Sequence, residues 1–362
     1  MNASARWSLL LGGAISGIAL YLAFRHVPLA ALWRYLGAVD YRFLGLSLAL
    51  VGILLAAKAL RWQIIIGVTH RVGFAHAFHP MMIGFMLNCI LPGRVGELAR
   101  PALLRRLCRV PFATGLGTVV TERILDMLTL LALFAWVLSG LNLDQAKTVP
   151  FGAYQLGGSA ILAAARTTLA LALLAIAAVV IWSLGPVRAW SVRLIRGLVA
   201  GAPFVSSPQR QWIETRLVVP LSTGLEHLAA GLGLVRQPLL LMACIGLSGL
   251  IWMLTVVSFQ VMALGFPDIQ LHLSQMAGVL VVICFCIALP SVPGWWGLWE
   301  AGGVFALSLF GIEAGPALGF TLVNHAAQVL PVILIGLASM MISGVRTGQL
   351  GTLSRRPPTP SH

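Results

Sequence analysis

Two stretches of this chain decide how it folds: Leu91-Pro92-Gly93-Arg94-Val95-Gly96-Glu97, and Leu289-Pro290-Ser291-Val292-Pro293-Gly294-Trp295-Trp296-Gly297-Leu298-Trp299-Glu300. Each follows an apolar run that it interrupts, and each ends on a glutamate, Glu97 or Glu300. Proline and glycine end helices, and backbone groups freed at membrane depth are tolerated only where protein or a water-filled cavity satisfies them. The repeated interruption predicts a site between two broken segments; two ordinary short or tilted helices are the alternative.

The composition is that of a protein that crosses a membrane several times. Hydrophobic residues make up 59% of the chain and charged residues 9%, and the mean hydropathy is +0.94. We therefore expect an all-α polytopic membrane protein with about six full spans, each of about 20 apolar residues. The expected spans are Trp7–Phe24, Phe43–Ile66, Thr114–Leu138, Thr167–Leu184, Leu239–Leu264 and Pro316–Ile342. The shorter runs Pro80–Leu91, Met276–Leu289 and Ala301–Phe310 predict the half-helices of two broken, re-entrant segments.

The charge of the loops predicts the orientation of the chain. The sequence holds 24 Lys and Arg residues against 10 Asp and Glu residues, a formal net charge of +14. Because these basic residues flank the spans, we attribute them to membrane orientation and anionic lipid headgroups rather than to nucleic acid. One alternating set of loops is the richer in basic residues: Arg6, Lys58–Arg71, Arg94–Arg109, Arg188–Arg236 and Arg346–Arg356. This predicts a multi-pass protein of the inner membrane with both termini in the cytoplasm, with Arg25, Arg34 and Arg42 as the exception.

The same topology predicts how the two broken segments are related. They would enter the membrane from opposite faces, as in an inverted repeat whose binding site lies near the midplane. We expect residues 1–345 to form a single integral membrane domain with amphipathic interfacial helices at about 186–236. Residues 346–362 are rich in proline and polar residues, which predicts a disordered cytoplasmic tail.

Charged residues inside one predicted span indicate a polar site. Glu122 and Asp126 are four residues apart and share a helical face, with Arg123 beside them. Even low estimates put the cost of one such charge at a helix centre at roughly 2.5–3.5 kcal/mol. The group therefore faces a partner or water. Headgroup binding or proton relay is one interpretation, and a structural ion-pair cluster that holds helices together is the other.

Both breaks carry further candidate residues for binding and translocation. After the first, Arg94 and Arg100 lie at helical spacing on either side of Glu97, and two guanidiniums suit a lipid phosphate because arginine binds phosphate bidentately. At the second, the candidates are Pro293, Gly294, Gly297 and Glu300.

A secondary polar patch lies in the last span, where Asn324, His325 and Gln328 predict either interhelical hydrogen bonds or substrate contacts. No metal site or cofactor is predicted: His76 and His79 have no second ligand cluster, and the five cysteines lie in or beside apolar runs. The sequence has no Walker A loop, Gly-x-Ser-x-Gly elbow or His-Glu-x-x-His motif, so we do not expect an enzyme of those classes.

Three motifs together resemble the lysylphosphatidylglycerol synthase transmembrane-region family of flippase-like membrane proteins. They are Leu91-Pro92-Gly93-Arg94-x-Gly-Glu97-x-x-Arg100, Thr121-Glu122-Arg123-x-x-Asp126 and Pro293-Gly294-x-x-Gly297-x-x-Glu300. The resemblance covers roughly residues 10 to 345. It implies a stand-alone inner-membrane protein, without the synthase domain of the fused members, that moves or presents phospholipids, glycolipids or hopanoids, with enzymes of lipid biosynthesis as expected partners.

From the residues and the resemblance we expect a lipid flippase whose polar cavity, between the two broken segments, receives an anionic, glycosylated or amino-modified headgroup. Arg94 and Arg100 would bind the headgroup, while Glu97, the acids of the central span and Glu300 would balance charge or relay protons. Two alternatives stay open: a membrane-embedded enzyme that modifies lipid headgroups, and a partner of a lipid-biosynthesis complex that transports nothing.

Overall fold

The computed structural model describes residues 39–140 except 93, residues 219–344 except 290 and 291, a short hairpin within 148–157, and scattered positions elsewhere. Four long helices form the frame: α3 (Tyr41–Gly67), α6 (Phe112–Gly140), α11 (Pro238–Ala263) and α14 (Ala314–Ile342). Three of them, α3, α11 and α14, are long and apolar enough to cross a membrane. The fold is therefore that of a polytopic helical membrane protein, as predicted. Of the six predicted spans, Trp7–Phe24 and Thr167–Leu184 fall mostly outside the described residues.

The two predicted breaks are present, and each separates a pair of short helices. The first separates α4 (Phe74–Ile90) from α5 (Gly96–Cys108), and the second separates α12 (Leu273–Ala288) from α13 (Leu298–Ser308), with the short 3-10 helix η3 (Pro293–Trp295) between them. With 17 and 16 residues, α4 and α12 are shorter than the roughly 20 residues of a full span. The predicted start of the first segment at Pro80 is wrong, because α4 begins at Phe74 and holds this proline inside the helix.

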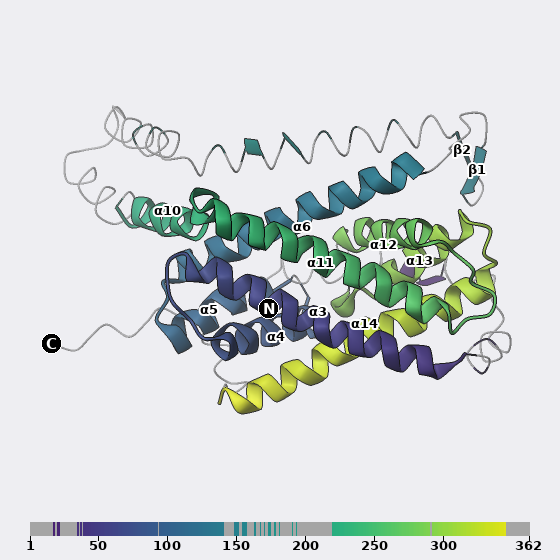
Figure 1. Ribbon diagram of the computed structural model, residues 1–362, viewed down its shortest axis with the longest axis horizontal. Helices are drawn as coiled ribbons and strands as arrows, with labels where there is room; N and C mark the ends of the chain where they lie inside the picture. The colour runs from purple at the N-terminus through teal and green to yellow at the C-terminus, as the bar shows by residue number, and fades with distance from the viewer. Residues whose placement is uncertain are drawn as a thin grey trace.

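The two helical hairpins approach each other from opposite ends of the long helices (Figure 1). Helix α4 begins where α3 ends, while α12 begins beyond the far end of α11, where the Asp40 N–H donates to the Gly265 carbonyl across 3.0 Å. Their tips meet: the Arg94 guanidinium donates to the Ile287 carbonyl across 2.9 Å. The described chain thus contains two inverted hairpins in contact through their breaks.

Glycine sets how closely the arms of the first hairpin pack. A Cβ atom added at Gly96 would lie 1.8 Å from the Gly84 carbonyl oxygen, and one added at Gly84 would lie 2.3 Å from the Arg100 side chain. The Gly96 N–H donates to the Asn88 side-chain oxygen across 2.7 Å, which bridges the break itself. A larger residue at Gly96 would therefore push α4 and α5 apart.

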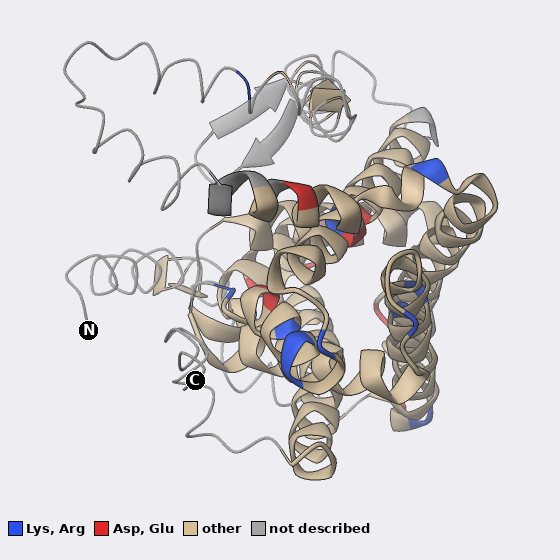
Figure 2. Cartoon of the chain, turned by 90° about the vertical axis from the view of Figure 1, so that its left-hand side faces the viewer, with Lys and Arg blue, Asp and Glu red and all other residues tan. Residues whose placement is uncertain are grey.

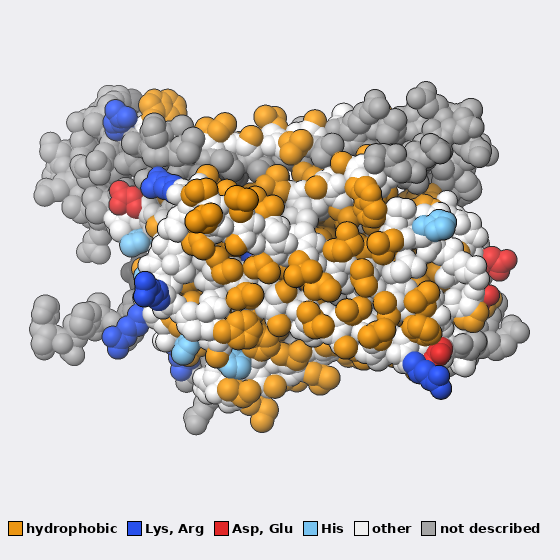
Figure 3. Space-filling model, viewed as in Figure 1, with side chains coloured by type: hydrophobic (Ala, Val, Ile, Leu, Met, Phe, Trp, Pro, Cys, Tyr) orange, Lys and Arg blue, Asp and Glu red, His pale blue; other side chains and the backbone are white. Residues whose placement is uncertain are grey.

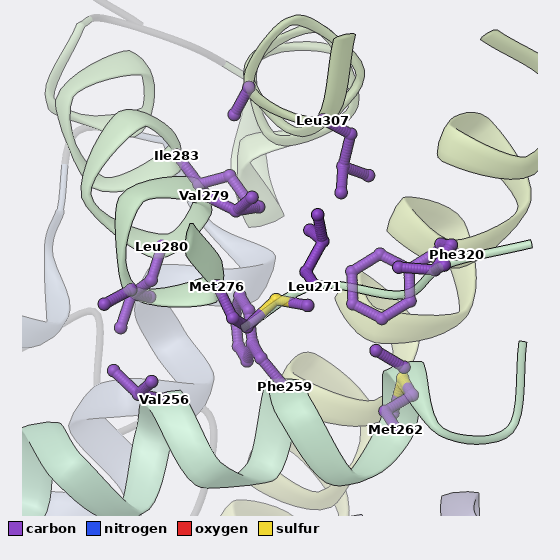
Figure 4. Close-up of a cluster of buried hydrophobic side chains, with 14 of the residues drawn as sticks. Val256, Phe259, Met262, Leu271, Met276, Val279, Leu280, Ile283, Leu307 and Phe320 are labelled. Atoms are coloured by element: carbon purple, nitrogen blue, oxygen red, sulfur yellow. The ribbon is translucent and has the colours of Figure 1, made fainter. Parts of the chain in front are cut away.

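The second hairpin packs into the main hydrophobic core (Figure 4). Side chains from α11, α12, α13 and α14 meet there, among them Phe259, Met276, Leu307 and Phe320. On the face that Figure 3 shows, hydrophobic side chains cover the middle, and charged side chains gather toward the two ends. Such an apolar surface between two polar ends is what a bilayer requires of a protein that crosses it.

The remaining described elements lie beside this frame. Strands β1 (Thr148–Phe151) and β2 (Tyr154–Gly157) form an antiparallel hairpin that the sequence did not predict. Helix α10 (Val219–Gly231) and the 3-10 helix η2 (Gly233–Arg236) cover the last part of the predicted interfacial region, and α10 packs on α6 through close contact of Gly231 with Gly117. Most of residues 186–218 and all of the predicted tail lie outside the described residues, so the domain boundaries stay predictions.

Candidate functional site

Six charged side chains gather inside the frame, and four helices contribute to their surroundings. Seen from the end where α3 stops, charged residues lie inside the bundle as well as on its rim (Figure 2). We call the group the charged cluster; its members are Lys58 and Arg61 from α3, Arg100 from α5, and Glu122, Arg123 and Asp126 from α6. Helix α11 contributes Ser248, whose hydroxyl accepts a hydrogen bond from Arg61 across 2.7 Å.

Glu122 is the centre of the charged cluster. Its fully buried carboxylate pairs with Arg100 through one oxygen, and through the other with Arg123 at 3.1 Å and Arg61 at 3.5 Å. Asp126, one turn further along α6, forms ion pairs with Arg61 at 2.7 Å and with Arg123 at 3.1 Å. Two acids therefore hold three arginines from three different helices.

Arg100 occupies the most enclosed position in the cluster. Only 1% of its side chain is exposed, and its guanidinium lies 4.3 Å from the ring centre of Trp62 and 5.3 Å from that of Phe85. Trp62 is fixed in turn by its indole N–H, which donates to the Thr118 hydroxyl across 3.1 Å. Stacking on aromatic faces and pairing with Glu122 leave Arg100 little freedom to follow a moving ligand.

The remaining cations of the charged cluster are more accessible. Arg123 is 43% exposed, and Lys58 is partly exposed, within coulombic range of Asp126 but with no ion pair in the described part of the chain. Four basic and two acidic side chains give the cluster an excess of two positive charges. Glu97, which is partly exposed and within coulombic range of Arg100 and Arg123, reduces the excess to one.

The charged cluster lies deep along the helices. At about 1.5 Å per residue, Arg123 is about 16 Å from the first residue of α6, and Lys58 is about 14 Å from the last residue of α3. Both distances run from the same end of the frame, where Val68 contacts Gly233 and Gly231 contacts Thr114. A partly exposed guanidinium at this depth requires water or an anionic partner.

Two members of the charged cluster were placed wrongly from the sequence. Lys58 and Arg61 were assigned to a cytoplasmic loop, but both lie inside α3, and Arg61 is fully buried. The signal that identifies them was available, because the predicted span Phe43–Ile66 already contains both residues. Arg61 completes the set of ion pairs that Glu122 and Asp126 make.

Arg94 lies apart from the charged cluster, at the tip of the first hairpin. It is exposed, with a backbone φ of 52°, and its guanidinium donates to the Ile287 carbonyl near the end of α12. Free carbonyls at a helix C-terminus attract a cation. Arg94 therefore links the two breaks, and part of its guanidinium remains accessible between them.

The second break is held by a buried acid and a buried histidine. Nδ1 of His325, on α14, lies 2.6 Å from Oε1 of Glu300, on α13, and its Nε2 lies 2.7 Å from the Gly294 carbonyl oxygen. The other Glu300 oxygen accepts from the Gly297 N–H across 2.6 Å, so the acid itself occupies the N-terminus of α13. Trp299 stacks on the imidazole at 4.7 Å with the rings nearly parallel. Pro293 begins η3, which precedes this turn.

The other residues of the secondary patch differ in their surroundings. Gln328 donates to the Ser258 hydroxyl on α11 across 3.3 Å. Asn324 is fully buried, and neither polar atom of its amide has a hydrogen-bond partner among the described residues. The predicted site residues therefore form two groups: Glu97 lies beside the charged cluster, and Glu300 is sealed into the second break. Within the described ranges, no group of three or more His, Cys, Asp or Glu side chains could hold a metal ion.

Comparison with known proteins assigns the chain to a family. A curated relative from Haloferax volcanii, named Glycosyltransferase AglD, is 26% identical over 352 residues, which cover 93% of this chain and 54% of that protein. The chain thus spans about half the length of this relative. The family model described as the lysylphosphatidylglycerol synthase TM region matches residues 9–336, nearly the whole chain. The chain therefore belongs to the lysylphosphatidylglycerol synthase transmembrane-region family.

Proposed function

We propose that this protein moves an anionic lipid between the two leaflets, with the lipid headgroup bound at the charged cluster and the tails left in the bilayer. The observation that carries the proposal is the excess positive charge of the cluster together with the exposure of Arg123 at membrane depth. A phosphate oxygen supplies the charge-assisted hydrogen bonds that this guanidinium lacks on its open side.

The basic residues of the charged cluster have different proposed roles, according to how far each is buried. Arg123 and Lys58, the accessible cations, contact the headgroup, whereas Arg61 and Arg100 are buried and hold the helices around Glu122. The expectation that Arg100 binds phosphate directly is therefore replaced by a supporting role. After the headgroup leaves the charged cluster, it contacts Arg94 at the point where the two breaks touch.

The distribution of surface charge supports an orientation. The end of the frame where α3 stops carries Arg71, Arg105, Arg109 and Arg236, which are exposed or partly exposed, and the opposite end carries exposed acids such as Asp268 and Glu313. By the positive-inside rule the basic end faces the cytoplasm. We accordingly propose that the protein lies in the inner membrane with both termini in the cytoplasm.

A second function has one observation in its favour, the name of the relative. A protein called a glycosyltransferase, of which this chain spans about half, supports a role in presenting a lipid to an enzyme that modifies its headgroup. Lipid analysis of a deletion strain separates the two roles. Translocation predicts unchanged lipid composition with an altered distribution between leaflets, and the second role predicts loss of a modified lipid.

The direct test is translocation of fluorescent NBD-phosphatidylglycerol in reconstituted vesicles, measured by the fraction that dithionite can quench. We expect the native protein to move the probe and Arg123→Gln to slow it about tenfold or more, because a hydrogen bond to a charged group contributes about 1.5–3 kcal/mol. Arg236→Gln, which removes an exposed arginine at the basic end, is the matched control and should keep the native rate. Native rates that equal those of empty vesicles would refute the proposal.

A further inference from the structure

The buried pair of Glu300 and His325 holds a defined number of protons. A carbonyl oxygen only accepts hydrogen bonds, so the contact with Gly294 requires a hydrogen on Nε2 of the imidazole. Oε2 of Glu300 likewise accepts from the Gly297 N–H and carries no hydrogen. The remaining contact, 2.6 Å between Oε1 and Nδ1, therefore contains one shared proton. This proton lies on the acid or on the imidazole, and the pair is neutral overall in both cases.

Neither loss nor gain of a proton is compatible with this contact. Without the shared proton, a carboxylate lone pair would face an imidazole lone pair at hydrogen-bond distance. With a second proton, two donors would face each other. Both side chains are fully buried, so water does not relieve either arrangement. A change in proton number therefore requires the two side chains to separate.

Separation of the pair loosens the second break. The pair joins α13 to α14, and the Nε2 contact ties η3 to α14. The Gly294 position lies against the first hairpin, since a Cβ atom added there would be 3.2 Å from the Cys89 carbonyl oxygen. The backbone beside it is strained at Trp295, a residue with a side chain at a φ of 60°. To open the contact between the two breaks, the protein must therefore break the same bonds that hold the shared proton.

Few other titratable groups approach this pair. Among the described residues, α12 places the Cys286 thiol against Gly302 on α13, α4 places Cys89 beside Gly294, and the Arg94 guanidinium lies at Ile287. From α11 the neighbour of Trp299 is the Phe259 ring, which does not titrate. Among the described residues of α12, η3, α13 and α14, Glu300 and His325 form the only ion pair.

We propose that the Glu300 and His325 pair is a proton-binding site that couples proton movement to lipid translocation. In the closed state the pair holds one proton between Oε1 and Nδ1. On opening, that proton leaves to water on one side, which leaves a carboxylate and a neutral imidazole. A proton from the other side restores the contact, so each cycle moves one proton and needs no other co-reactant. The inference rests on the proposed function, to which it adds an energy source.

One substitution removes the titratable proton and keeps the bonds. In Glu300→Gln, the amide nitrogen can donate to Nδ1 of the neutral His325, while the amide oxygen still accepts from the Gly297 N–H. We expect this variant to fold and to move NBD-phosphatidylglycerol at a rate independent of a pH gradient. The native protein should respond to a gradient of one pH unit by up to tenfold, as expected for one proton per cycle. Glu313→Gln, an exposed carboxyl at the start of α14, is the control and should respond as the native protein does.

A second measurement covers the case in which Glu300→Gln is inactive. Vesicles that contain the pH dye pyranine and the native protein should change their internal pH when phosphatidylglycerol is added to one leaflet. Translocation without proton movement would overturn the inference and leave the proposed function intact, as would a full gradient response in Glu300→Gln. A native protein that moves no lipid would overturn both.

Discussion

Replacing Glu122 with glutamine separates the structural part of the charged cluster from the part that we propose binds lipid. The native carboxylate is fully buried and pairs with Arg61, Arg100 and Arg123. Glutamine keeps the shape of the side chain and removes its charge. Arg61 retains Asp126, but Arg100 loses its only ion-pair partner within the described residues. Removal of one partner from a buried ion pair costs about 3–5 kcal/mol.

Arg123 provides the matched comparison on the same helix. Its side chain is 43% exposed, and ion pairs of exposed groups contribute about 1 kcal/mol or less. Arg123→Gln should therefore slow lipid translocation with little effect on stability, whereas Glu122→Gln should lower stability strongly. In the double variant Arg100→Gln with Glu122→Gln, no unpaired guanidinium remains beside the site. We expect part of the lost stability to return, with a coupling energy of about 0.5–3 kcal/mol.

Thermal unfolding in detergent micelles, followed by tryptophan fluorescence, measures the order of these effects. The expected order of midpoints is native, then Arg123→Gln, then the double variant, with Glu122→Gln lowest. Equal midpoints for Glu122→Gln and Arg123→Gln would refute the assignment of Glu122 as the structural centre. Absence of any recovery in the double variant would refute its direct coupling to Arg100.

Three further predictions concern the two hairpins. Gly96→Ala should lower the unfolding midpoint, at a cost of about 1–3 kcal/mol or more, because its Cβ would lie 1.8 Å from a carbonyl oxygen, whereas Gly52→Ala, with nothing within 4 Å, should keep or raise it. Gly297→Ala should cost about 1–2 kcal/mol in the same assay, because its φ is 88°, and a midpoint equal to that of Gly52→Ala would contradict this reason. Arg94→Gln should increase amide hydrogen exchange in the second break by removing the bond to Ile287; unchanged exchange there would show that this contact does not hold the tips together.

The sequence predicted the parts of the fold that local chemistry controls. Pro92 and Pro290 each come two residues after the last residue of a helix, α4 or α12, and a proline disfavours continuation of a helix, so both breaks appear where expected. The long apolar runs predicted α3, α6, α11 and α14 to within a few residues, because burial in a bilayer requires continuous apolar length. The start of α4 was missed because Pro80, read as a boundary, lies within a membrane helix.

The pairing within the site could be predicted only in part. The spacing of Glu122, Arg123 and Asp126 on one helix is visible in the sequence, but the partner of Arg61 on α11 is 187 positions away. Arg94 pairs with a backbone carbonyl 193 positions away, and a carbonyl leaves no trace in residue type. Such contacts depend on how helices distant in sequence are arranged in space.

The central claim is that the charged cluster binds an anionic headgroup, and native mass spectrometry tests it most directly. The protein in detergent is titrated with phosphatidylglycerol, and the bound lipid is counted for the native chain, for Lys58→Gln with Arg123→Gln, and for Arg236→Gln. We predict one retained lipid in the native chain and in Arg236→Gln, and its loss in the double variant. Equal retention by all three proteins would contradict the claim.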